Sequence, residues 1–431
     1  MNDPKRGETT AASTAGSYAP RGNSRPRGGP PLPNSTWPAH TAETVPWRQK
    51  VRGGSRDDRM LTQIEASIPP LIAHLHYMPD AEVLSACRAA ELAIVRLDSD
   101  AGTEYAPLAA LLTRTEAVSS SKIERVSASL DDYARAVGGS RANAAASSMI
   151  AAGAALHDLV TASGTRGHIE LGDILQAHYL LMRNDPVDGE TAGQLRTVQN
   201  WILGSDHSPR GAVHIPPVPE RVPELMEDLL DYANRDDVAP ILQAAVVHAQ
   251  FETIHPFPDG NGRIGRALIN AVLRRHGVTT RIVVPIASAM AADRDRYFRL
   301  VNDYRTGKLN PFIRLLARAA AVSAEESRVS SDRLREIRDE WASLSRPRAG
   351  SAAAKLLEVL PANPVITSNL ADMLVGSPRS SVFTALERLE SDGVIHEVSG
   401  RKQGRVYVAS ALMDELDDLE RRIGARMMES D

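Results

Sequence analysis

The sequence predicts a mainly α-helical protein with one β-hairpin flap and a small C-terminal domain of helices and a short hairpin. Two observations predict this class. Apolar residues recur at helical spacing, with breaks, from about residue 57 to about residue 318, and few stretches there alternate with the period of two typical of strands. Residues 347–425 differ, because three helical stretches are followed by two alternating ones around a glycine-containing turn.

The N-terminal residues 1–55 are rich in Pro, Gly, Ser and Arg and contain almost no aliphatic side chains. They carry eight Lys or Arg against three Asp or Glu, a net charge of +5. This apolar content is too small to offset chain entropy, so the pattern predicts a disordered basic tail. Trp37 and Trp47 are either anchors or incidental, and binding of nucleic acid or acidic partners by the tail stays open.

Two helical regions follow, at 56–180 and 181–318. In the second, a helix with an apolar stripe ending at Phe251 is stopped by Pro256 and Pro258, because proline lacks an N–H and disfavours helix in the residue before it. Gly260-Asn261-Gly262 frees the backbone for a tight loop, and a helical pattern restarts at Arg263. The loop therefore lies at a helix N-terminus, where free N–H groups and the helix dipole favour an anion.

Residues 255–266 read HPFPDGNGRIGR and combine a base, a carboxylate and two arginines around that loop. His255 has a near-neutral ordinary pKa and suits removal of a proton from a hydroxyl. Asp259 is placed to hold Mg²⁺ against phosphates. Arg263 and Arg266 are three residues apart and share a helix face. Each feature alone is common in helical cores and turns, but this order favours a site that binds and attacks a polyphosphate.

The segment resembles the signature of the Fic family, H-x-F-x-[D/E]-G-N-G-R-x-x-R, at every defined position. The resemblance implies a mostly helical core that transfers AMP from ATP to a protein hydroxyl, with pyrophosphate leaving. It implies His255 as general base, Asp259 as Mg²⁺ ligand and Phe257 as an anchor of the loop in the core. The phosphate-binding residues that it implies are Gly260, Asn261 and Gly262 for the α-phosphate, and Arg263 and Arg266 for the β- and γ-phosphates.

Two further segments look similar to parts of Fic proteins. Residues 210–217, RGAVHIPP, resemble the flap hairpin that holds a target segment by strand addition, which would make Val213, His214 and Ile215 docking residues. An ordinary surface loop is the alternative. Residues 294–300 resemble the segment that closes over adenine, with Tyr297 against the base or ribose; a core aromatic is the alternative.

Residues near 114–127 resemble the inhibitory helix of Fic proteins, [S/T]-x-x-x-E-[G/N]. Ser120 and Glu124 match this motif, whereas Arg125 stands where Gly or Asn is usual. A carboxylate that pairs with Arg266 takes the place of the ATP γ-phosphate, so we expect self-inhibition. A solvated helix carboxylate is the alternative for Glu124.

The C-terminal part begins with an Ala-, Ser- and Arg-rich helical linker at 319–346. The outline that follows, in residues 347–425, is that of a winged helix-turn-helix. Its expected elements are helices at 352–360, 368–374 and 380–392 and strands at 394–398 and 405–408.

The third of these helices would be the recognition element for DNA. The residues expected to face DNA are Arg379, Ser380, Ser381 and Arg388 on the helix and Arg401, Lys402 and Arg405 on the wing. Protein contact or homodimerisation is the alternative use of this domain, and the acidic Glu387 and Glu390 favour it.

The overall composition excludes several classes of protein. A net charge of −4 gives no global affinity for nucleic acid. One cysteine, Cys87, allows no intramolecular disulfide and predicts a reducing cytoplasm, with a core role for its side chain. No apolar run approaches the ~20 residues that span a bilayer, and the N-terminus lacks a signal-peptide pattern. We therefore expect a cytoplasmic protein with no membrane partner.

The resemblance thus implies a protein adenylyltransferase that uses ATP and Mg²⁺, modifies a Ser, Thr or Tyr hydroxyl of a protein, its own chain included, and is restrained by Glu124. Three alternatives stay open. Glu124 could position water to remove AMP, the donor could be another nucleotide, or the Fic-like core could sense nucleotide for a winged-helix transcriptional regulator.

Overall fold

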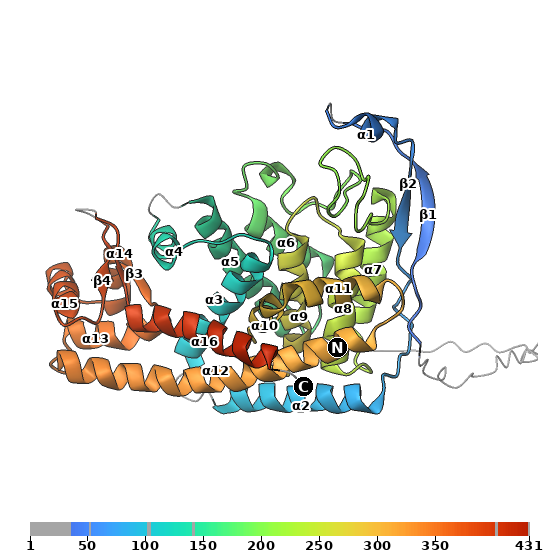
Figure 1. Ribbon diagram of the computed structural model, residues 1–431. Coiled ribbons are helices and arrows are strands. Elements are labelled where there is room, and N and C mark those ends of the chain that lie inside the picture. Colours follow the sequence, from blue (N-terminus) through green and yellow to red (C-terminus); the bar gives the residue numbers. More distant parts are fainter. Residues whose placement is uncertain (1–35, 51–52, 101–104, 140–142, 401–403, 430–431) are drawn as a thin grey trace, which may run out of the picture.

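The computed structural model describes residues 36–50, 53–100, 105–139, 143–400 and 404–429, and these are mainly helical, as predicted (Figure 1). The longer helices are α2 (Ala81–Asp100), α3 (Tyr105–Ile123), α5 (Ala144–Arg166), α6 (Leu171–Met182), α7 (Val222–Ala233), α8 (Pro240–Ile254), α9 (Asn261–Arg275), α11 (Arg294–Tyr304), α12 (Asn310–Ser345), α15 (Arg379–Ser391) and α16 (Ser410–Met428). The shorter ones are α1 (Arg56–Met60), α4 (Leu130–Val137), α10 (Ile286–Ala292), α13 (Ala352–Val359), α14 (Ser368–Val375) and the 3₁₀ turns η2 (Gly189–Thr191), η3 (Pro219–Arg221) and η4 (Leu360–Ala362). The strands are β1 (Thr41–Pro46), β2 (Gln63–Ile68), β3 (Val365–Thr367), β4 (His396–Glu397) and β5 (Val406–Val408).

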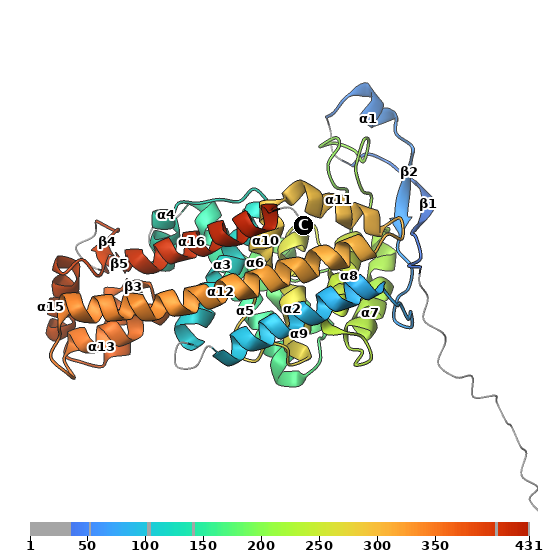
Figure 2. The same cartoon turned by 60° about the horizontal axis from the view of Figure 1, so that its bottom comes forward.

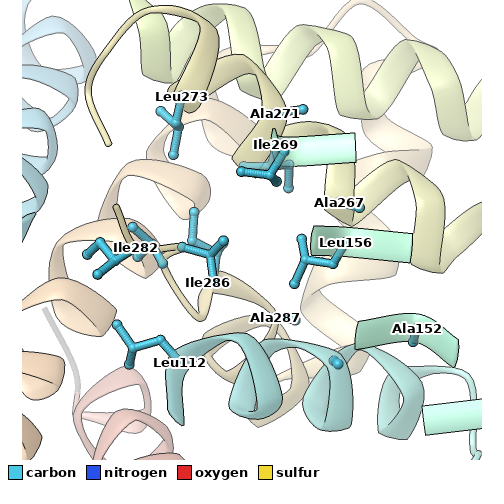
Figure 3. Close-up of a cluster of buried hydrophobic side chains, with 14 of the residues drawn as sticks. Leu112, Ala152, Leu156, Ala267, Ile269, Ala271, Leu273, Ile282, Ile286 and Ala287 are labelled. Carbon is cyan, nitrogen blue, oxygen red and sulfur yellow. The ribbon is translucent and has the colours of Figure 1, made fainter. Parts of the chain in front are cut away.

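The hydrophobic core lies around α8 and α9, which are buried along most of their length. Figure 3 shows how neighbouring helices meet there: Ile269 of α9 and Leu156 of α5 point into the same space as Leu112 of α3 and Ile286 of α10. All of these side chains are buried. The core therefore fixes α9, whose N-terminus carries the predicted phosphate site, against α3 and α5.

The prediction of a disordered tail is wrong for residues 36–50, which the structure describes. β1 pairs antiparallel with β2, from Thr41 opposite Ile68 to Pro46 opposite Gln63. Trp37 is buried, with its ring 5.7 Å from that of Tyr77. The composition of residues 36–50 is poor in aliphatics, but β2 supplies the partner strand and its alternate residues are buried. Residues 1–35 lie outside the described residues.

α12 is a single helix of 36 residues that joins the core to the C-terminal unit. Figure 2 shows it running along the molecule with α2 on one side and α16 on the other. The expected linker at 319–346 is therefore the continuation of α12, and it is packed, since Leu334, Ile337 and Trp341 are buried. Packing against α2 and α16 explains why so long a helix is stable.

The C-terminal unit contains α13, α14 and α15 close to the predicted bounds and a three-stranded antiparallel sheet in the order β3-β5-β4. β3 was not predicted; it covers only Val365–Thr367 and pairs with β5. α16, red in Figure 1, returns from this unit along α12 and contacts α10 and α3. Arg401 and Lys402, expected on the wing, lie outside the described residues. Within the described ranges, none of the helices combines the length and apolar character needed to cross a bilayer.

Candidate active site

The turn between α8 and α9 carries the predicted base. His255 caps α8 in the left-handed conformation, with φ 49° and ψ 61°, and its N–H donates to Phe251 O at 2.9 Å. This backbone costs a non-glycine residue ~1–2 kcal/mol, so the surrounding contacts must fix it. Asn261 does so from the start of α9: its Oδ1 accepts from Phe257 N–H and its Nδ2 donates to Phe257 O, both at 2.9 Å. Phe257 is fully buried, as expected for an anchor of the loop.

Gly260 makes the approach to α9 possible. Its φ is 79°, which favours glycine, and it directly precedes the first residue of α9. The first N–H groups of α9 have no partners within the helix, so the loop and the helix end present the free donors that an anion site requires.

His178, which no local sequence pattern marks, supports this loop from α6. Its ring stacks on that of Phe257 with 3.8 Å between centroids. Gly193 N–H donates to Nδ1 at 2.9 Å, so Nε2 carries the proton and donates to Asp259 O at 3.1 Å. Burial lowers the pKa of His178 to about 4, and the neutral ring acts as a fixed bridge.

Arg196 is a second supporting residue that sequence reasoning missed. Its Nε donates to His255 O at 2.8 Å and its Nη2 donates to Ile254 O at 3.3 Å, which satisfies carbonyls at the end of α8. Nη2 also donates to Pro217 O at 2.5 Å. Arg196 therefore ties the backbone of the predicted base to Pro217, the last residue of the predicted flap.

The imidazole of His255 is neutral at physiological pH. Its Nδ1 lies 3.3 Å from Glu252 O, and because a carbonyl only accepts, Nδ1 carries the proton and Nε2 is left as the acceptor. Burial lowers the pKa of His255 to about 4; the contact with Glu252 opposes this shift, while Arg196 and Arg305 add to it. The neutral form is the one that a general base requires.

Arg266 is the most enclosed charge of the site. It is fully buried, and its Nε donates to Ser120 Oγ at 2.8 Å while Nη2 donates to Ser120 O at 2.9 Å and to Glu124 Oε1 at 2.8 Å. Burial disfavours its charge, but Glu124 more than compensates, so the pKa of Arg266 is raised. The structure thus brings together Ser120, Glu124 and Arg266 as the sequence predicted.

Glu124 also lies at the N-terminus of α9. A Cβ added at Gly262 would collide with Oε1 of Glu124, so only glycine leaves room for the carboxylate there. Burial raises the pKa of Glu124, but the charge of Arg266, its hydrogen bond and the charge of Arg263 outweigh burial and lower it. The ionised carboxylate therefore occupies the place where a helix N-terminus and Arg266 attract an anion.

Arg125, the departure from the family motif, adopts φ 61°. Its N–H donates to Lys122 O at 2.9 Å, and Val126 N–H donates to Ser121 O at 3.0 Å, so α3 closes with the left-handed residue that glycine usually provides. This backbone requirement gives a physical reason for Gly or Asn in the motif, and Arg125 meets it with strain.

The other predicted phosphate-binding arginine of α9 lies beside the exposed carboxylate of Asp259. Arg263 Nη1 donates to Ser148 Oγ at 2.8 Å, and Nη2 lies 3.5 Å from a carboxylate oxygen of Asp259. Asp259 is 58% exposed, whereas Arg263 is buried. Burial and the charges of Asp259 and Asp185 raise the pKa of Asp188. These three carboxylates therefore lie close enough to interact beside the site.

These side chains suit a divalent cation only if bound phosphates supply the remaining ligands. No group of three or more His, Cys, Asp or Glu residues surrounds a common centre in the described part of the chain. Mg²⁺ is commonly held by one or two carboxylates together with substrate phosphates, and exposed Asp259 beside the anion site suits that arrangement.

The expectation that Tyr297 contacts the nucleotide requires correction. Tyr297 is buried, and its hydroxyl lies 2.9 Å from His248 Nε2 and 3.5 Å from Arg266 Nη1. It lies on the face of α11 that packs against the core, which is the alternative that the sequence left open. Its contact with Arg266 helps to fix the position of that guanidinium.

The predicted flap is a hairpin with one β-bridge within the described residues. Ile202 N–H donates to His214 O, and Val213 N–H donates to Ile202 O, both at 2.9 Å. Val213 is 53% exposed and is available for docking, but His214 is buried with Nε2 2.9 Å from Thr253 O. His214 therefore anchors the flap to α8, which corrects its assignment as a docking residue. Ile215 O already accepts from Ser67 N–H of β2 at 2.8 Å, so at this residue the backbone is occupied.

The N-terminal segment also braces the tip of the flap, a relationship that the sequence did not indicate. Ser208 Oγ donates to Asp58 Oδ1 at 2.6 Å, and both residues are buried. Asp57 pairs with Arg210 at 2.8 Å on the surface. Asp58 is held in place by a capping box with Ser55 at the start of α1.

Comparisons with known proteins agree with this geometry. Residues 168–273 match the family described as Fic/DOC. The chain is 31% identical over 161 residues to protein adenylyltransferase fic-1 of Caenorhabditis elegans, covering 36% of this chain and 28% of that protein. It is 34% identical over 154 residues to protein adenylyltransferase Fic of Nematostella vectensis, covering 35% and 32%. The chain thus spans about a third or less of these curated relatives.

A solved structure shares the fold. A Fic family protein of Desulfovibrio desulfuricans G20 superposes with a TM-score of 0.50 at 22% identity, covering 77% of this chain and 97% of that one. At this identity the likeness shows the fold alone.

Proposed function

We propose, because residues 168–273 form a Fic domain, that the protein is an adenylyltransferase that transfers AMP from ATP to a hydroxyl side chain of a protein and is restrained by its own Glu124. The observation that carries this proposal is the pairing of Glu124 with Arg266 at the N-terminus of α9, next to the neutral His255. A carboxylate there marks the site as one that attracts an anion.

In the proposed reaction, Nε2 of His255 takes the proton of a Ser, Thr or Tyr hydroxyl. That oxygen forms a bond to the α-phosphorus of ATP, the bond from this phosphorus to the β-phosphate oxygen breaks, and pyrophosphate leaves. The fixed Nδ1 contact with Glu252 O orients the ring for this transfer. Positioning and charge stabilisation supply most of the catalysis in reactions of this type.

The phosphates would lie against the N-terminus of α9, with Arg263 and Arg266 contributing positive charge. Asp259 would hold Mg²⁺, which when bound neutralises charge on the phosphates. Buried Arg266 cannot move far, since Ser120 and Tyr297 also contact it. The γ-phosphate and Glu124 therefore compete for one fixed guanidinium.

Mass spectrometry of the purified protein with ATP and Mg²⁺ tests this proposal. We expect Glu124→Gly to gain one AMP per modified hydroxyl at a rate at least about tenfold above the wild type, because ~1.4 kcal/mol of lost competition is a tenfold rate. The double variant Glu124→Gly/His255→Ala should gain nothing. Equal labelling with and without His255 would exclude it as the base, and no labelling of Glu124→Gly would refute the activity.

Two variations of this experiment separate the remaining alternatives. Incubating AMP-modified protein with the wild type asks whether Glu124 serves removal of AMP instead. Replacing ATP with GTP, UTP or a CDP-alcohol tests the donor, because the contacts described above concern phosphates and leave the base undetermined.

We also propose that the C-terminal unit is a winged helix-turn-helix that contacts protein. The order of its helices and strands supports the fold. Three arginines expected to face DNA are engaged within the chain: Arg379 lies 3.3 Å from Asp372, Arg405 lies 3.6 Å from Glu397, and Arg388 donates to Ser345 O. These contacts favour protein contact or homodimerisation over DNA binding as the role of this unit.

Two measurements test this second proposal. Sedimentation of the full-length protein reports whether it self-associates, and we expect no mobility shift of duplex DNA at low salt. A shift with strong salt dependence would instead favour DNA binding, and a shift that changes with ATP would favour the nucleotide-sensing regulator. A cytoplasmic location is part of the same proposal, supported by the single, buried Cys87.

A further inference from the structure

α3 presents two opposite faces to two different parts of the protein. With about 100° of rotation per residue, positions 116, 120 and 124 share one face and positions 114, 118 and 122 share the other. On the first face, Ser120 and Glu124 contact Arg266, and Glu116 Oε2 accepts from Ala287 N–H of α10 at 2.8 Å. This face belongs to the nucleotide site.

The second face contacts the C-terminal unit and α16. Lys122 Nζ lies 2.6 Å from Glu420 Oε2 of α16, and Arg114 Nη2 donates to Ala362 O of η4 at 3.4 Å. Between them, Val118 is buried in a hydrophobic cluster that includes Met413 of α16. The cluster's other buried members come from the C-terminal sheet, from α4 and from α5: Val365, Val406, Val408, Tyr133, Ala134 and Met149.

The end of α3 has little freedom of its own. Arg294 Nε of α11 donates to Ile123 O at 2.6 Å, and Ser119 Oγ lies 2.8 Å from Ser288 Oγ of α10. Lys122 is two residues before Glu124, so the ion pair with α16 and the ion pair with Arg266 lie on opposite sides of the same turn. A shift of that turn away from α16 changes the position of Glu124 as well.

We propose that the C-terminal unit and α16 position the inhibitory carboxylate, with Lys122, Val118 and Glu420 as the positioning residues that hold Glu124 against Arg266. This inference rests on the proposed function for its effect on activity, but the contacts themselves do not. Because coupling between two sites is reciprocal, displacement of Glu124 by ATP also loosens the packing of the C-terminal unit on α3.

Reversal of one charge pair tests the proposal in the full-length protein. Glu420→Lys and Lys122→Glu each place like charges together, and the double variant restores an opposite pair in reversed order. Asp414→Lys is the matched control, because Asp414 is exposed on α16 and undergoes the same change of charge. The first readout is amide hydrogen exchange of residues 119–126 without nucleotide, and the second is the rate of AMP labelling with ATP and Mg²⁺.

We expect each single reversal to speed exchange of these amides and to raise labelling about two- to fivefold, the range that one partly exposed ion pair supplies. The double variant should return to wild-type values, and Asp414→Lys should match the wild type. In a Glu124→Gly background, Glu420→Lys should add nothing to labelling, because the carboxylate through which it acts is gone; a merely structural role would still alter labelling there.

The two readouts distinguish this inference from the proposed activity. If exchange near Glu124 is the same in Glu420→Lys and Asp414→Lys, the positioning role is overturned whatever the activity. If exchange responds and the double variant rescues it while Glu124→Gly shows no labelling, the positioning role stands and the adenylyltransferase proposal fails.

Discussion

Oε1 of Glu124 lies 2.8 Å from Nη2 of Arg266, at the N-terminus of the helix that follows the predicted base. The two residues are 142 positions apart in the chain. Arg266 is fully buried, so leaving its charge unpaired costs free energy, and Glu124, in the turn directly after α3, supplies the partner. In the proposed reaction, a phosphate of ATP would replace the Glu124 carboxylate at this fixed guanidinium.

Competition at Arg266 predicts a change in nucleotide affinity. We expect Glu124→Gly to bind ATP with Mg²⁺ about tenfold more tightly than the wild type, and Glu124→Gln to lie between, because Gln keeps the volume but not the charge. Calorimetry with a non-hydrolysable ATP analogue measures this without turnover. Glu82→Gln, an exposed change on α2, is the control. Equal affinities in all four proteins would mean that Glu124 and the phosphates do not share a site.

The strained backbone of Arg125 predicts a stabilising substitution. Arg125→Gly should raise the free energy of unfolding by about 1 kcal/mol, because glycine adopts a φ of 61° without steric cost. Because the end of α3 then forms without strain, Arg125→Gly should also show a lower basal rate of AMP labelling than the wild type. Thermal unfolding measures the first effect, and Arg125→Ala is the control, since alanine loses the side chain but keeps the strain. If Arg125→Ala stabilises as much as Arg125→Gly, the backbone explanation fails.

The sequence predicted the loop well because its determinants are local. Proline ends α8, Gly260 takes a positive φ, and Asn261 closes the loop on Phe257 over four residues. Resemblance to a family added Glu124, whose contact with Arg266 joins residues 142 positions apart in the chain. Local pattern has no access to such pairs unless a motif records them.

The parts that the sequence missed depend on long-range pairing. β1 is stable because β2 lies beside it, and Asp58 braces the flap from 150 residues away. His178 reaches the loop from α6 across 81 residues. Tyr297 was misassigned because an amphipathic helix gives the same pattern whether its aromatic side chain meets a ligand or the core. In each case the missing information is tertiary.

The depressed pKa of His255 predicts an unusual pH profile. An ordinary histidine base loses activity as pH falls through about 6.5. Here we expect labelling by Glu124→Gly to stay level from pH 8 to about pH 5 and to fall as His255 becomes protonated near its pKa of about 4. Folding stability changes in the same direction as activity. The contribution of neutral His255 to the free energy of unfolding is complete above its unfolded pKa of 6.5, and it is lost as pH falls through about 4. A midpoint of activity near pH 6.5 would contradict the neutral, partly buried imidazole.

The buried bond between Ser208 and Asp58 predicts that the N-terminal segment controls the order of the flap. Asp58→Ala leaves Ser208 without its partner and removes the acceptor that holds α1 on the flap tip, so amides of residues 201–214 should exchange about tenfold faster, the ratio equivalent to ~1.4 kcal/mol. Asp57→Ala is a matched control, because it removes a neighbouring carboxylate whose ion pair with Arg210 is exposed and therefore weak. Mass spectrometry of hydrogen exchange compares the two variants over the same peptides. If Asp57→Ala loosens the flap as much as Asp58→Ala, negative charge rather than the buried hydrogen bond holds the segment, and the brace assigned to Ser208 is wrong.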